Sequence, residues 1–595
     1  MSALSKTNKY LFRYKYHLLF GALFVCIANI FQIVPAQVVR TTFDLVAETI
    51  KLHGMYNGTA NKSGIYDMFI NSLVIYGLVI VGMALLRGFF MFLMRQTIIV
   101  MSRHIEYDQK NDIYEHYQSL PVSFYRKNNT GDLMARISED VSKVRMYFGP
   151  AIMYGMNLIS TVILVVPIMF SINAKLTLWA LIPLPILSIT IYYVNNLIEK
   201  KSLEIQRSLS ALSTFVQEAF SGIRVIKAFA RENDSLRNYE IKTETYKSKS
   251  LELAQVNSVF APAMMAMVGM SVLIIIYVGG NEVIAGNITA GNIAEFIMYV
   301  TMLTWPFTAL GWVSSIIQRA EASQQRINEF LDVKTDIVSE RNLINEITGT
   351  IKFENVTLVY PESGIKALDN VTFEVEQGQS LAILGTTGSG KSTIANLMCR
   401  LMDVTDGQIL IDGVNIKDFE IFHLRNQIGY VPQDVFLFSD TIENNIAFGS
   451  LKISEEKIIQ SAKDADLYDN ISSFKDGLQT RVGERGITLS GGQKQRLSIA
   501  RALARDPKLL ILDDCLSAVD THTENNILNS LEALMIGKTS IIISHRVSSA
   551  KLANYIIMLD EGKVIERGTH HELYNSKSKY RELFDKQMQA EEVDS

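Results

Sequence analysis

The chain has 595 residues, which is too many for one hydrophobic core and enough for a helical membrane domain followed by a globular domain. Hydrophobic residues make up 48% and charged residues 20%, but these averages combine two unlike halves. A formal net charge of −4 gives no electrostatic basis for binding nucleic acid, so we expect no nucleic-acid partner. Three widely spaced cysteines lack metal-ligand spacing and are expected to be free thiols in a reducing compartment: Cys26, Cys399 and Cys515.

Six uncharged, mostly apolar runs in the first half predict six membrane-spanning helices. Each run is about as long as the roughly 20 residues that an α-helix needs to cross a bilayer. The runs cover residues 18–39, 68–86, 146–173, 176–198, 253–281 and 296–318. Lys6, Lys9, Arg13 and Lys15 precede the first run without an acidic residue, which predicts a cytoplasmic N-terminus.

Long polar stretches separate the second run from the third and the fourth from the fifth. Both have helix-like periodicity, so we expect the membrane helices to extend well into the cytoplasm. Each stretch contains a local break where a short transverse helix could form: FYRKNNTGDLMARI at 124–137, the first coupling segment, and QEAFSGIRVIKAFARE at 217–232, the second. Solvated helical hairpins are one interpretation, but the length favours a mechanical role, since a connector needs only a few residues.

Two charged residues, Arg87 and Glu295, lie within or beside the predicted spans. Charged groups at membrane depth usually face protein or water rather than lipid. For Arg87 the sequence leaves two interpretations open, the lining of a substrate cavity and a structural ion pair.

Short strands rich in Val and Ile alternate with helical patterns after about residue 350, as in an α/β fold. We therefore expect a membrane domain at 1–335, a linker at 336–350 and a second domain at 351–595. The stretch SLAILGTTGSGKST in this domain has the form of a strand, a glycine-rich loop and a helix start. Its spacing is G-x-x-x-x-G-K-S, from Gly385 to Ser392, which predicts a phosphate-binding loop.

The glycines of this phosphate loop let backbone N–H groups surround phosphates at a helix N-terminus. Lys391 is expected to reach the β- and γ-phosphates and Ser392 to ligate Mg²⁺. The residues of the loop expected to contact a nucleotide are Gly385, Thr386, Thr387, Gly388, Ser389, Gly390, Lys391, Ser392 and Thr393.

Further candidate motifs follow the phosphate loop along the chain. In LSGGQKQR at 489–496, Ser490, Gly491 and Gly492 precede a helical pattern and can present hydroxyl and N–H groups to an anion. An apolar strand pattern ends in Asp513 and is followed by Asp514. The strand-like run SIIISH ends in a histidine, His545.

This combination resembles the ATP-binding cassette family, and specifically exporter half-transporters in which the membrane and nucleotide domains are fused. The resemblance covers nearly the whole chain. It implies a six-span α-helical transmembrane domain followed by an α/β P-loop NTPase domain, with ATP and Mg²⁺ as ligands. It also implies a second half-transporter chain as partner. Two ATP molecules would then each be bound by the phosphate loop of one chain and by the signature loop, residues 490–493, of the other.

The resemblance assigns roles to individual residues. Tyr360 would stack on adenine, His545 would be the switch histidine facing the γ-phosphate, and Gln433 would touch both Mg²⁺ and the attacking water. The signature loop would be Ser490, Gly491, Gly492 and Gln493, and the Mg²⁺ ligands would be Ser392, Gln433 and Asp513. Residues 483–486 look like the exporter-specific segment, and residues 517–520 look like the loop that communicates across the dimer. The two coupling segments match the family's coupling helices.

Asp514 departs from the pattern, because exporters normally carry at this position a glutamate that polarises the attacking water. Aspartate is one methylene shorter, and a misplacement of about 1 Å can cost about 10²-fold in rate. Related heterodimeric exporters show the same change in the half whose own pocket is slow. The intact signature loop fits this assignment and the intact His545 weakens it, so we favour a heterodimer and keep a homodimer as the alternative.

We therefore expect ATP-driven export or flipping of drugs or lipids across the plasma membrane by alternating access. The N-terminus and the nucleotide-binding domain would be cytoplasmic, and the spans would contact membrane lipids. A nucleotide-gated channel or regulator is the alternative from another class, and a peptide exporter is the alternative within transport. The six spans exclude the soluble members of the family that act on DNA or ribosomes.

Overall fold

The computed structural model describes residues 3–55, 62–450, 452–483, 486, 489–515, 528, 532, 533 and 535–594. The chain divides into two compact units. The helical unit contains Met1–Gln118 and Thr130–Val333, and the α/β unit contains Ser119–Asn129 and Lys334–Ser595. The short stretch Ser119–Asn129 thus belongs to the α/β unit, although the chain on both sides of it belongs to the helical unit.

Six segments among the described residues are helical, long and apolar enough to cross a membrane. They cover Lys15–Leu52, Tyr66–Ser119, Thr130–Ile172, Ala174–Ser221, Glu232–Ile284 and Ala290–Leu331. Each overlaps one of the six predicted runs, so the predicted six-span class of the first domain is confirmed. The segments have 38 to 54 residues, about twice the roughly 20 that a bilayer requires, and they therefore extend well beyond it.

The third segment is not a continuous α-helix. Two π-helical turns interrupt it, η2 at Arg136–Asp140 and η3 at Tyr147–Ala151, and Pro150 lies in the second turn, where it cannot donate a helical hydrogen bond. The α-helices and 3₁₀ turn of this unit are η1 (Ala3–Thr7), α1 (Asn8–Arg13), α2 (Lys15–Met55), α3 (Lys62–Ser119), α5 (Thr130–Ala135), α6 (Val141–Met146), α7 (Ile152–Ile172), α8 (Ala174–Leu181), α9 (Pro183–Ser221), α10 (Ile223–Ala228), α11 (Glu232–Ile284) and α12 (Ala290–Leu331).

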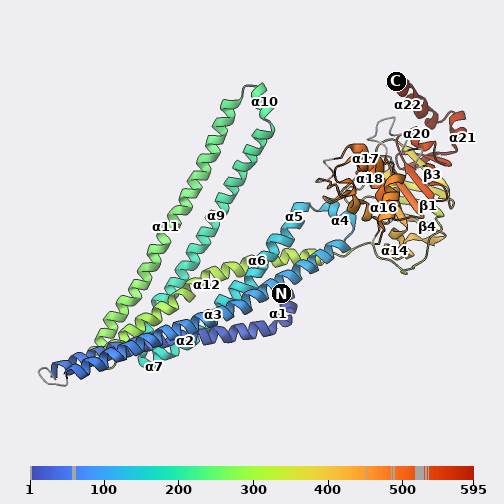
Figure 1. Cartoon of the computed structure of the whole chain (residues 1–595). Coiled ribbons are helices and arrows are strands. Elements are labelled where there is room, and N and C mark those ends of the chain that lie inside the picture. The colour runs from blue at the N-terminus through green and yellow to red at the C-terminus, as the bar shows by residue number, and fades with distance from the viewer. Residues whose placement is uncertain are drawn as a thin grey trace. The chain divides into compact units, whose positions relative to one another are not determined.

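Helix α12 is the centre of the helical unit and packs on α2, α7, α9 and α11. Phe296, Tyr299 and Leu303 of α12 are fully buried at these contacts. Helices α9 and α11 lie side by side along their length, and the short helix α10 joins them at one end (Figure 1, green). The second coupling segment therefore forms the tip of a long helical hairpin.

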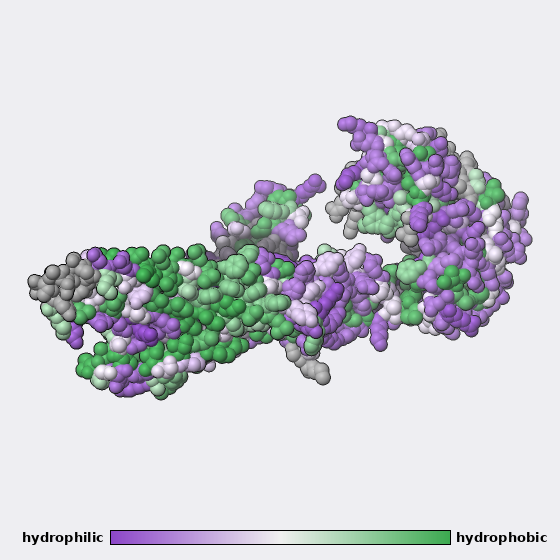
Figure 2. Space-filling view, turned by 60° about the horizontal axis from the view of Figure 1, so that its bottom comes forward, coloured by the Kyte–Doolittle hydropathy of each residue, from purple (hydrophilic) through white to green (hydrophobic). Residues whose placement is uncertain are grey.

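Apolar side chains cover much of the visible surface of the helical unit (Figure 2, green). Exposed apolar residues of this unit include Leu19 and Leu23 of α2 and Ile75, Leu78 and Leu85 of α3. Extended apolar surface of this kind occurs where lipid or another chain covers the protein.

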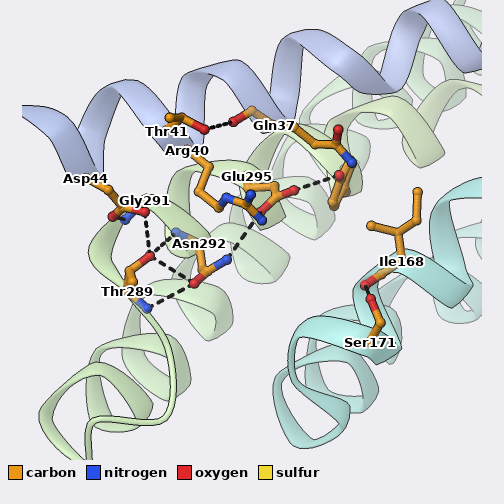
Figure 3. Close-up of polar contacts among 11 residues, drawn as sticks. Gln37, Arg40, Thr41, Asp44, Ile168, Ser171, Thr289, Gly291, Asn292 and Glu295 are labelled. Atoms are coloured by element: carbon orange, nitrogen blue, oxygen red, sulfur yellow. Dashed lines mark hydrogen bonds and ion pairs between the residues drawn. The ribbon is translucent and has the colours of Figure 1, made fainter.

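A polar cluster joins the end of α2 to the start of α12 (Figure 3). The carboxylate of Glu295, which is fully buried, accepts hydrogen bonds from Tyr299 Oη at 2.7 Å and from Asn292 Nδ2 at 3.2 Å. Arg40 of α2 places Nη1 3.4 Å from Oε2 of the same carboxylate. Glu295 thus has an ion pair and hydrogen bonds within the protein, as a buried charge requires.

One turn further along α2, Asp44 holds the first residues of α12 (Figure 3). Its carboxylate accepts a hydrogen bond from Thr289 Oγ1 at 3.0 Å and another from the Gly291 N–H at 3.0 Å. A Cβ at Gly291 would lie 2.4 Å from the carbonyl oxygen of Arg40, so only glycine permits this close approach of the two helices.

In the α/β unit, two sheets of the described strands pack together. One contains six strands in the order β10-β9-β3-β8-β7-β6, parallel except for β10, and the other contains four antiparallel strands in the order β2-β1-β4-β5. The strands are β1 (Ile351–Val359), β2 (Lys366–Val375), β3 (Ser380–Gly385), β4 (Asp406–Ile411), β5 (Val414–Asn415), β6 (Ile428–Val431), β7 (Leu509–Asp513), β8 (Thr539–Ile543), β9 (Tyr555–Asp560) and β10 (Lys563–Gly568). Strands β3, β7 and β8 are buried along their whole length, which explains the apolar runs within them, at 381–384, 509–512 and 541–543.

Helices cover these sheets and follow the strands in alternation, so the predicted α/β class is confirmed. The helical elements are α4 (Val122–Lys127), α13 (Lys391–Met398), η4 (Ile416–Asp418), α14 (Ile421–Asn426), α15 (Ile442–Ala447), α16 (Glu455–Asp464), α17 (Tyr468–Ser473), η5 (Gly477–Gln479), α18 (Gly491–Leu503), α20 (Val547–Ala550), α21 (His570–Asn575) and α22 (Lys579–Asp594). Because β3, β7 and β8 are parallel neighbours, the residues that follow them meet at one edge of the sheet.

Residues 334–350, which contain the expected linker, lie along the α/β unit. The Glu340 N–H donates to the Lys417 carbonyl and the Leu343 N–H donates to the Asp418 carbonyl, both at 2.9 Å. The fully buried Arg400 donates from Nη2 to the Val338 carbonyl at 2.7 Å. These three hydrogen bonds hold the backbone of the segment against the α/β unit.

Candidate nucleotide-binding site

The phosphate loop lies between β3 and α13, as predicted. Gly390, the N-cap of α13, has a left-handed φ of 97°, and a Cβ there would lie 2.3 Å from the Ala367 carbonyl oxygen. A side chain at this position would therefore meet both backbone strain and a steric clash. The loop thus turns directly into the helix start, the arrangement that presents N–H groups to a phosphate.

Lys391 is the first residue of α13 and its amine turns back over the loop. Nζ donates to the carbonyl oxygens of Gly385 and Thr386, both at 2.8 Å. Burial lowers the pKa of the Lys391 amine, although the nearby carboxylates of Asp514 and Asp513 oppose this shift. The loop therefore holds its lysine close to the position where anionic phosphates would lie.

Ser392 and Asp513 meet beneath the loop. Ser392 Oγ donates to Asp513 Oδ1 at 3.1 Å, and Asp513 is almost completely buried at the end of β7. Burial raises the pKa of Asp513 to about 6, with Ser392 and Lys391 acting in the opposite direction and Asp514 adding to the rise. A hydroxyl and a carboxylate are the oxygen ligands that Mg²⁺ uses together with substrate phosphates, so this pair fits a magnesium ion.

Asp514 stands at the centre of the three residues expected to take part in catalysis. Its Oδ1 lies 2.8 Å from His545 Nδ1, and its Oδ2 accepts a hydrogen bond from Gln433 Nε2 at 3.3 Å. The backbone of Asp514 has a left-handed φ of 48°, which aspartate tolerates better than most residues. The structure thus joins Gln433 to Asp514 through a direct hydrogen bond.

Tyr360 lines a cavity together with residues of the phosphate loop and Asp514. Its hydroxyl group lies 3.0 Å from Thr393 Oγ1, at the start of α13. Its ring faces the guanidinium of Arg126, whose Cζ lies 5.6 Å from the ring centroid. The cavity has a volume of about 390 Å³ and its lining includes Arg126, Tyr360, Lys391, Asp513, Asp514 and His545.

The signature loop does not line this cavity. Ser490 caps α18 instead: its Oγ accepts from the Gln493 N–H at 3.3 Å, and its own N–H donates to Gln493 Oε1 at 3.0 Å. Ser490 and Gly491 are exposed to solvent. The loop therefore presents a preformed helix start on the surface, apart from the phosphate loop of its own chain.

Two predicted segments fall outside the described residues. These are Glu484 and Arg485 of the exporter-specific segment and the communication loop at 517–520. The three cysteines are free thiols, as predicted.

Two residues near the site were not found from the sequence. Arg126 lies in α4 of the first coupling segment, whose helix break was recognised but whose contact with Tyr360 was not. Gln587 of α22 bonds to the backbone on both sides of Arg546, next to His545. No local motif marks either residue, because each contact joins positions more than 30 residues apart.

Comparison with known proteins agrees with this geometry. A family model described as "ABC transporter transmembrane region" matches residues 18–307, and one described as "ABC transporter" matches residues 368–517. The probable multidrug resistance ABC transporter ATP-binding/permease protein YheI of Bacillus subtilis (strain 168) is 38% identical over 477 residues, which are 79% of this chain and 81% of that protein. The chain belongs to the ABC transporter family. It is an ATP-binding, ATP-hydrolysing membrane transport protein that crosses the membrane several times.

Two further relatives give the same family. The ABC transporter ATP-binding protein YknU of Bacillus subtilis (strain 168), described as uncharacterized, is 36% identical over 81% of this chain and 83% of its own length. A putative multidrug export ATP-binding/permease protein of Staphylococcus aureus (strain NCTC 8325 / PS 47) is 35% identical over 81% of this chain and 84% of its own length. The similarity to all three thus covers both units of this ABC transporter.

Proposed function

We propose that this chain is one half of a dimeric exporter that moves hydrophobic or amphipathic molecules, drugs or lipids, across the plasma membrane by alternating access. The names of two relatives, which describe multidrug resistance and multidrug export, support this substrate class. The broad apolar surface of the helical unit supports its place within lipid. The basic residues before α2 support a cytoplasmic N-terminus, and with six spans the α/β unit would lie on the same side.

The dimer proposal rests on the separation of the two nucleotide-binding loops. Within this chain the signature loop contributes nothing to the described lining of the phosphate-loop cavity. Ser490, Gly491, Gly492 and Gln493 nevertheless form an ordered helix start. A second chain would complete each ATP site by placing such a helix start against the phosphates.

A second part of the proposal is that the nucleotide pocket of this chain cleaves ATP slowly. The observation that supports it is the arrangement around Asp514. Its carboxylate contacts His545 through one oxygen and Gln433 through the other, so both oxygens of the shorter side chain already have partners. A glutamate would reach one methylene further toward the attacking water. We therefore propose that this pocket binds ATP with Mg²⁺ held by Ser392, Gln433 and Asp513, and that it cleaves ATP slowly. The partner is then a similar chain that carries glutamate at this position, and a homodimer is the alternative.

The hairpin tip supports coupling between nucleotide binding and transport. Phe220, Val225 and Phe229 are exposed there. The adjacent groove is lined mostly by apolar side chains of α9, α10 and α11, together with Lys227, Glu232 and Ser235. We propose that this second coupling segment docks on the nucleotide domain of the partner chain. Closure of the two nucleotide domains around ATP would then move the membrane helices.

Arg87 of α3 is a candidate residue for contact with the substrate. Among the residues that the structure describes, Arg87 makes no ion pair, and its side chain is half-buried in α3. Because a charge at membrane depth needs protein, water or ligand around it, we propose that Arg87 faces the substrate cavity.

The decisive experiment is transport into inside-out vesicles by this chain, alone and with candidate partner chains. An exporter accumulates a fluorescent lipid or drug against its gradient when ATP is added, whereas a nucleotide-gated channel only equilibrates it. If the isolated chain forms a dimer that hydrolyses ATP and transports at the full rate, the heterodimer proposal is wrong. If the substrate only equilibrates, the exporter proposal is wrong.

A further inference from the structure

The C-terminal helix α22 contacts the loop that carries His545. The loop leads from β8 into the short helix α20, and α22 packs beside α20 (Figure 1). Gln587 of α22 donates from Nε2 to the carbonyl oxygen of His545 at 2.7 Å and accepts at Oε1 from the Val547 N–H at 2.8 Å. One side chain thus holds the backbone on both sides of Arg546.

The bond to Val547 satisfies a group that the helix cannot satisfy itself. Val547 is the first residue of α20, and the first N–H groups of an α-helix have no intrahelical acceptor. A side-chain oxygen at this place stabilises the helix start in the same way as an N-cap residue. Gln587 supplies that oxygen from 40 residues further along the chain.

The position of Gln587 is itself fixed by the base of α22. Glu566 of β10 accepts from the Lys579 N–H at 2.7 Å and from the Tyr580 N–H at 3.1 Å. The Tyr580 side chain is fully buried, and its hydroxyl lies 2.6 Å from His570 Nδ1. One turn further on, the amine of Lys551 lies 4.5 Å from the centroid of the Phe584 ring. Helix α22 therefore reaches the His545 loop as an anchored element.

We infer that Gln587 is a positioning residue for the switch histidine, and that α22 sets the place of His545 over the nucleotide site. The physical connection has three steps: the amide of Gln587 holds the His545 backbone, the His545 imidazole contacts Asp514 at 2.8 Å, and Asp514 is bonded to Gln433. A displacement of α22 would move the imidazole relative to the carboxylate. This inference goes beyond the transport cycle, because it gives the C-terminal helix a means to change the hydrolysis rate.

The test uses the full-length transporter with four forms of this chain, in the otherwise native background and in the Asp514→Glu background. The forms are wild type, Gln587→Ala, Gln587→Glu and the matched control Gln589→Ala, which changes an exposed glutamine two residues further on. Hydrogen–deuterium exchange of a peptide covering residues 543–551 reports the loop directly. Steady-state hydrolysis in the Asp514→Glu background gives kcat and the KM for ATP.

Gln587→Ala should raise the exchange of the Val547 amide about tenfold, which is the effect of one lost hydrogen bond. It should lower kcat about three- to tenfold while leaving KM for ATP unchanged. Gln587→Glu keeps the acceptor for Val547 and loses the donor to His545, so it should protect the amide like wild type and still lower kcat. Gln589→Ala should match wild type in both measurements.

Unchanged amide exchange in Gln587→Ala would overturn the inference, as would a fall in hydrolysis explained entirely by a higher KM. If Gln587→Ala and Gln589→Ala have the same effect, α22 acts only through general stability and the inference is also wrong. The inference depends on the proposed role of His545, and the two measurements separate the failures. If neither wild type nor Asp514→Glu hydrolyses ATP at this pocket, the proposed slow site is wrong. The exchange data would still decide whether Gln587 holds the loop.

Discussion

The two units each contain a buried carboxylate in a polar cluster, and the clusters differ in what surrounds them. Glu295 of the helical unit is fully buried and its carboxylate contacts Arg40, Asn292 and Tyr299, all from the two helices that it joins. Asp514 of the α/β unit lies on the wall of a cavity. Both carboxylates have partners in the protein, but only Asp514 borders a space that a ligand can enter.

This difference shows how the same chemistry serves two purposes. A carboxylate surrounded on all sides by donors stabilises one packing of two helices. A carboxylate on the wall of a cavity can lose its hydrogen-bond donors to a ligand that enters the cavity. In the α/β unit we expect a nucleotide and its metal ion to replace the present contacts of four side chains, those of Lys391, Ser392, Gln433 and His545. We therefore expect substitutions in the first cluster to change stability and substitutions in the second to change activity.

The largest effect on activity is expected from Lys391→Ala. If Lys391 binds the phosphates as proposed, its removal should lower hydrolysis at this pocket, and transport by the whole protein, by at least about 10²-fold. Vesicle transport and phosphate release measure both losses, and Lys452→Ala, at an exposed position of the same unit, is the matched control. Full transport together with unchanged nucleotide binding in Lys391→Ala would show that the phosphate loop has been assigned wrongly.

Asp514→Glu is expected to increase activity at this pocket, up to about 10²-fold, because the added methylene restores the reach of the carboxylate. The left-handed backbone at Asp514 suits glutamate less well, so the variant should also lose about 1 kcal/mol of stability. Single-turnover hydrolysis and thermal unfolding of the same samples measure the two effects. Asp514→Asn preserves the side-chain size and removes the charge, and an increase in rate with this control would contradict a role for the longer carboxylate.

The signature loop gives a related test in the assembled dimer. Ser490→Ala removes the cap of α18 and the hydroxyl group that we propose contacts the partner's nucleotide, so hydrolysis by the transporter should fall more than in any Asp514 variant. The comparison requires both chains in one membrane, with Ser450→Ala as the control at a position outside the loop. Equal losses in Ser490→Ala and Asp514→Asn would instead indicate two equivalent sites.

Glu295→Ala is expected to destabilise the helical unit by about 1–3 kcal/mol, because it leaves buried donors on Tyr299 and Asn292 without their acceptor. Glu295→Gln keeps an oxygen acceptor and should lose less. Thermal unfolding in detergent measures both variants, and the KM for ATP should remain at the wild-type value. A change in that KM without a change in unfolding temperature would mean that the polar cluster acts on the nucleotide site.

The smallest effect is expected at Arg126, whose guanidinium faces the ring of Tyr360. If adenine stacks on this face, it must displace Arg126, so Arg126→Ala should tighten ATP binding about fivefold, the equivalent of about 1 kcal/mol for a partly exposed cation–π contact. Equilibrium binding of ATP measures the change, and Lys127→Ala is the neighbouring control. Weaker binding in Arg126→Ala would show that the guanidinium contributes to the bound state.

The features predicted from the sequence are those that depend on neighbouring residues. The phosphate loop between a buried strand and a helix follows from the stretch around Lys391, and the six spans follow from uncharged runs. The helices are longer than those runs because hydropathy marks only the part that crosses the bilayer. Helix α2, for example, continues from Lys15 to Met55, where the predicted run covered 18–39.

The features that the sequence did not predict join distant parts of the chain. Arg40 meets Glu295 across 255 positions, and Gln587 meets His545 across 42. No periodicity or motif specifies which of many polar side chains will pair over such separations. The π-helical turns of the third span were missed for another reason, since they replace α-helical turns without changing the apolar pattern.

The assignment of Ser119–Asn129 to the α/β unit changes what counts as a separable part of this protein. The backbone passes between the two units three times, at positions 118–119, 129–130 and 333–334. A fragment covering 351–595 would contain none of these crossings and would lack residues 119–129 of the α/β unit. Such a fragment would keep Tyr360 and lose Arg126, so the Tyr360 ring, the proposed adenine contact, would lack the cation that faces it in the intact chain. If adenine stacks on Tyr360 as proposed, nucleotide affinities measured on the excised domain would therefore omit the competition from Arg126.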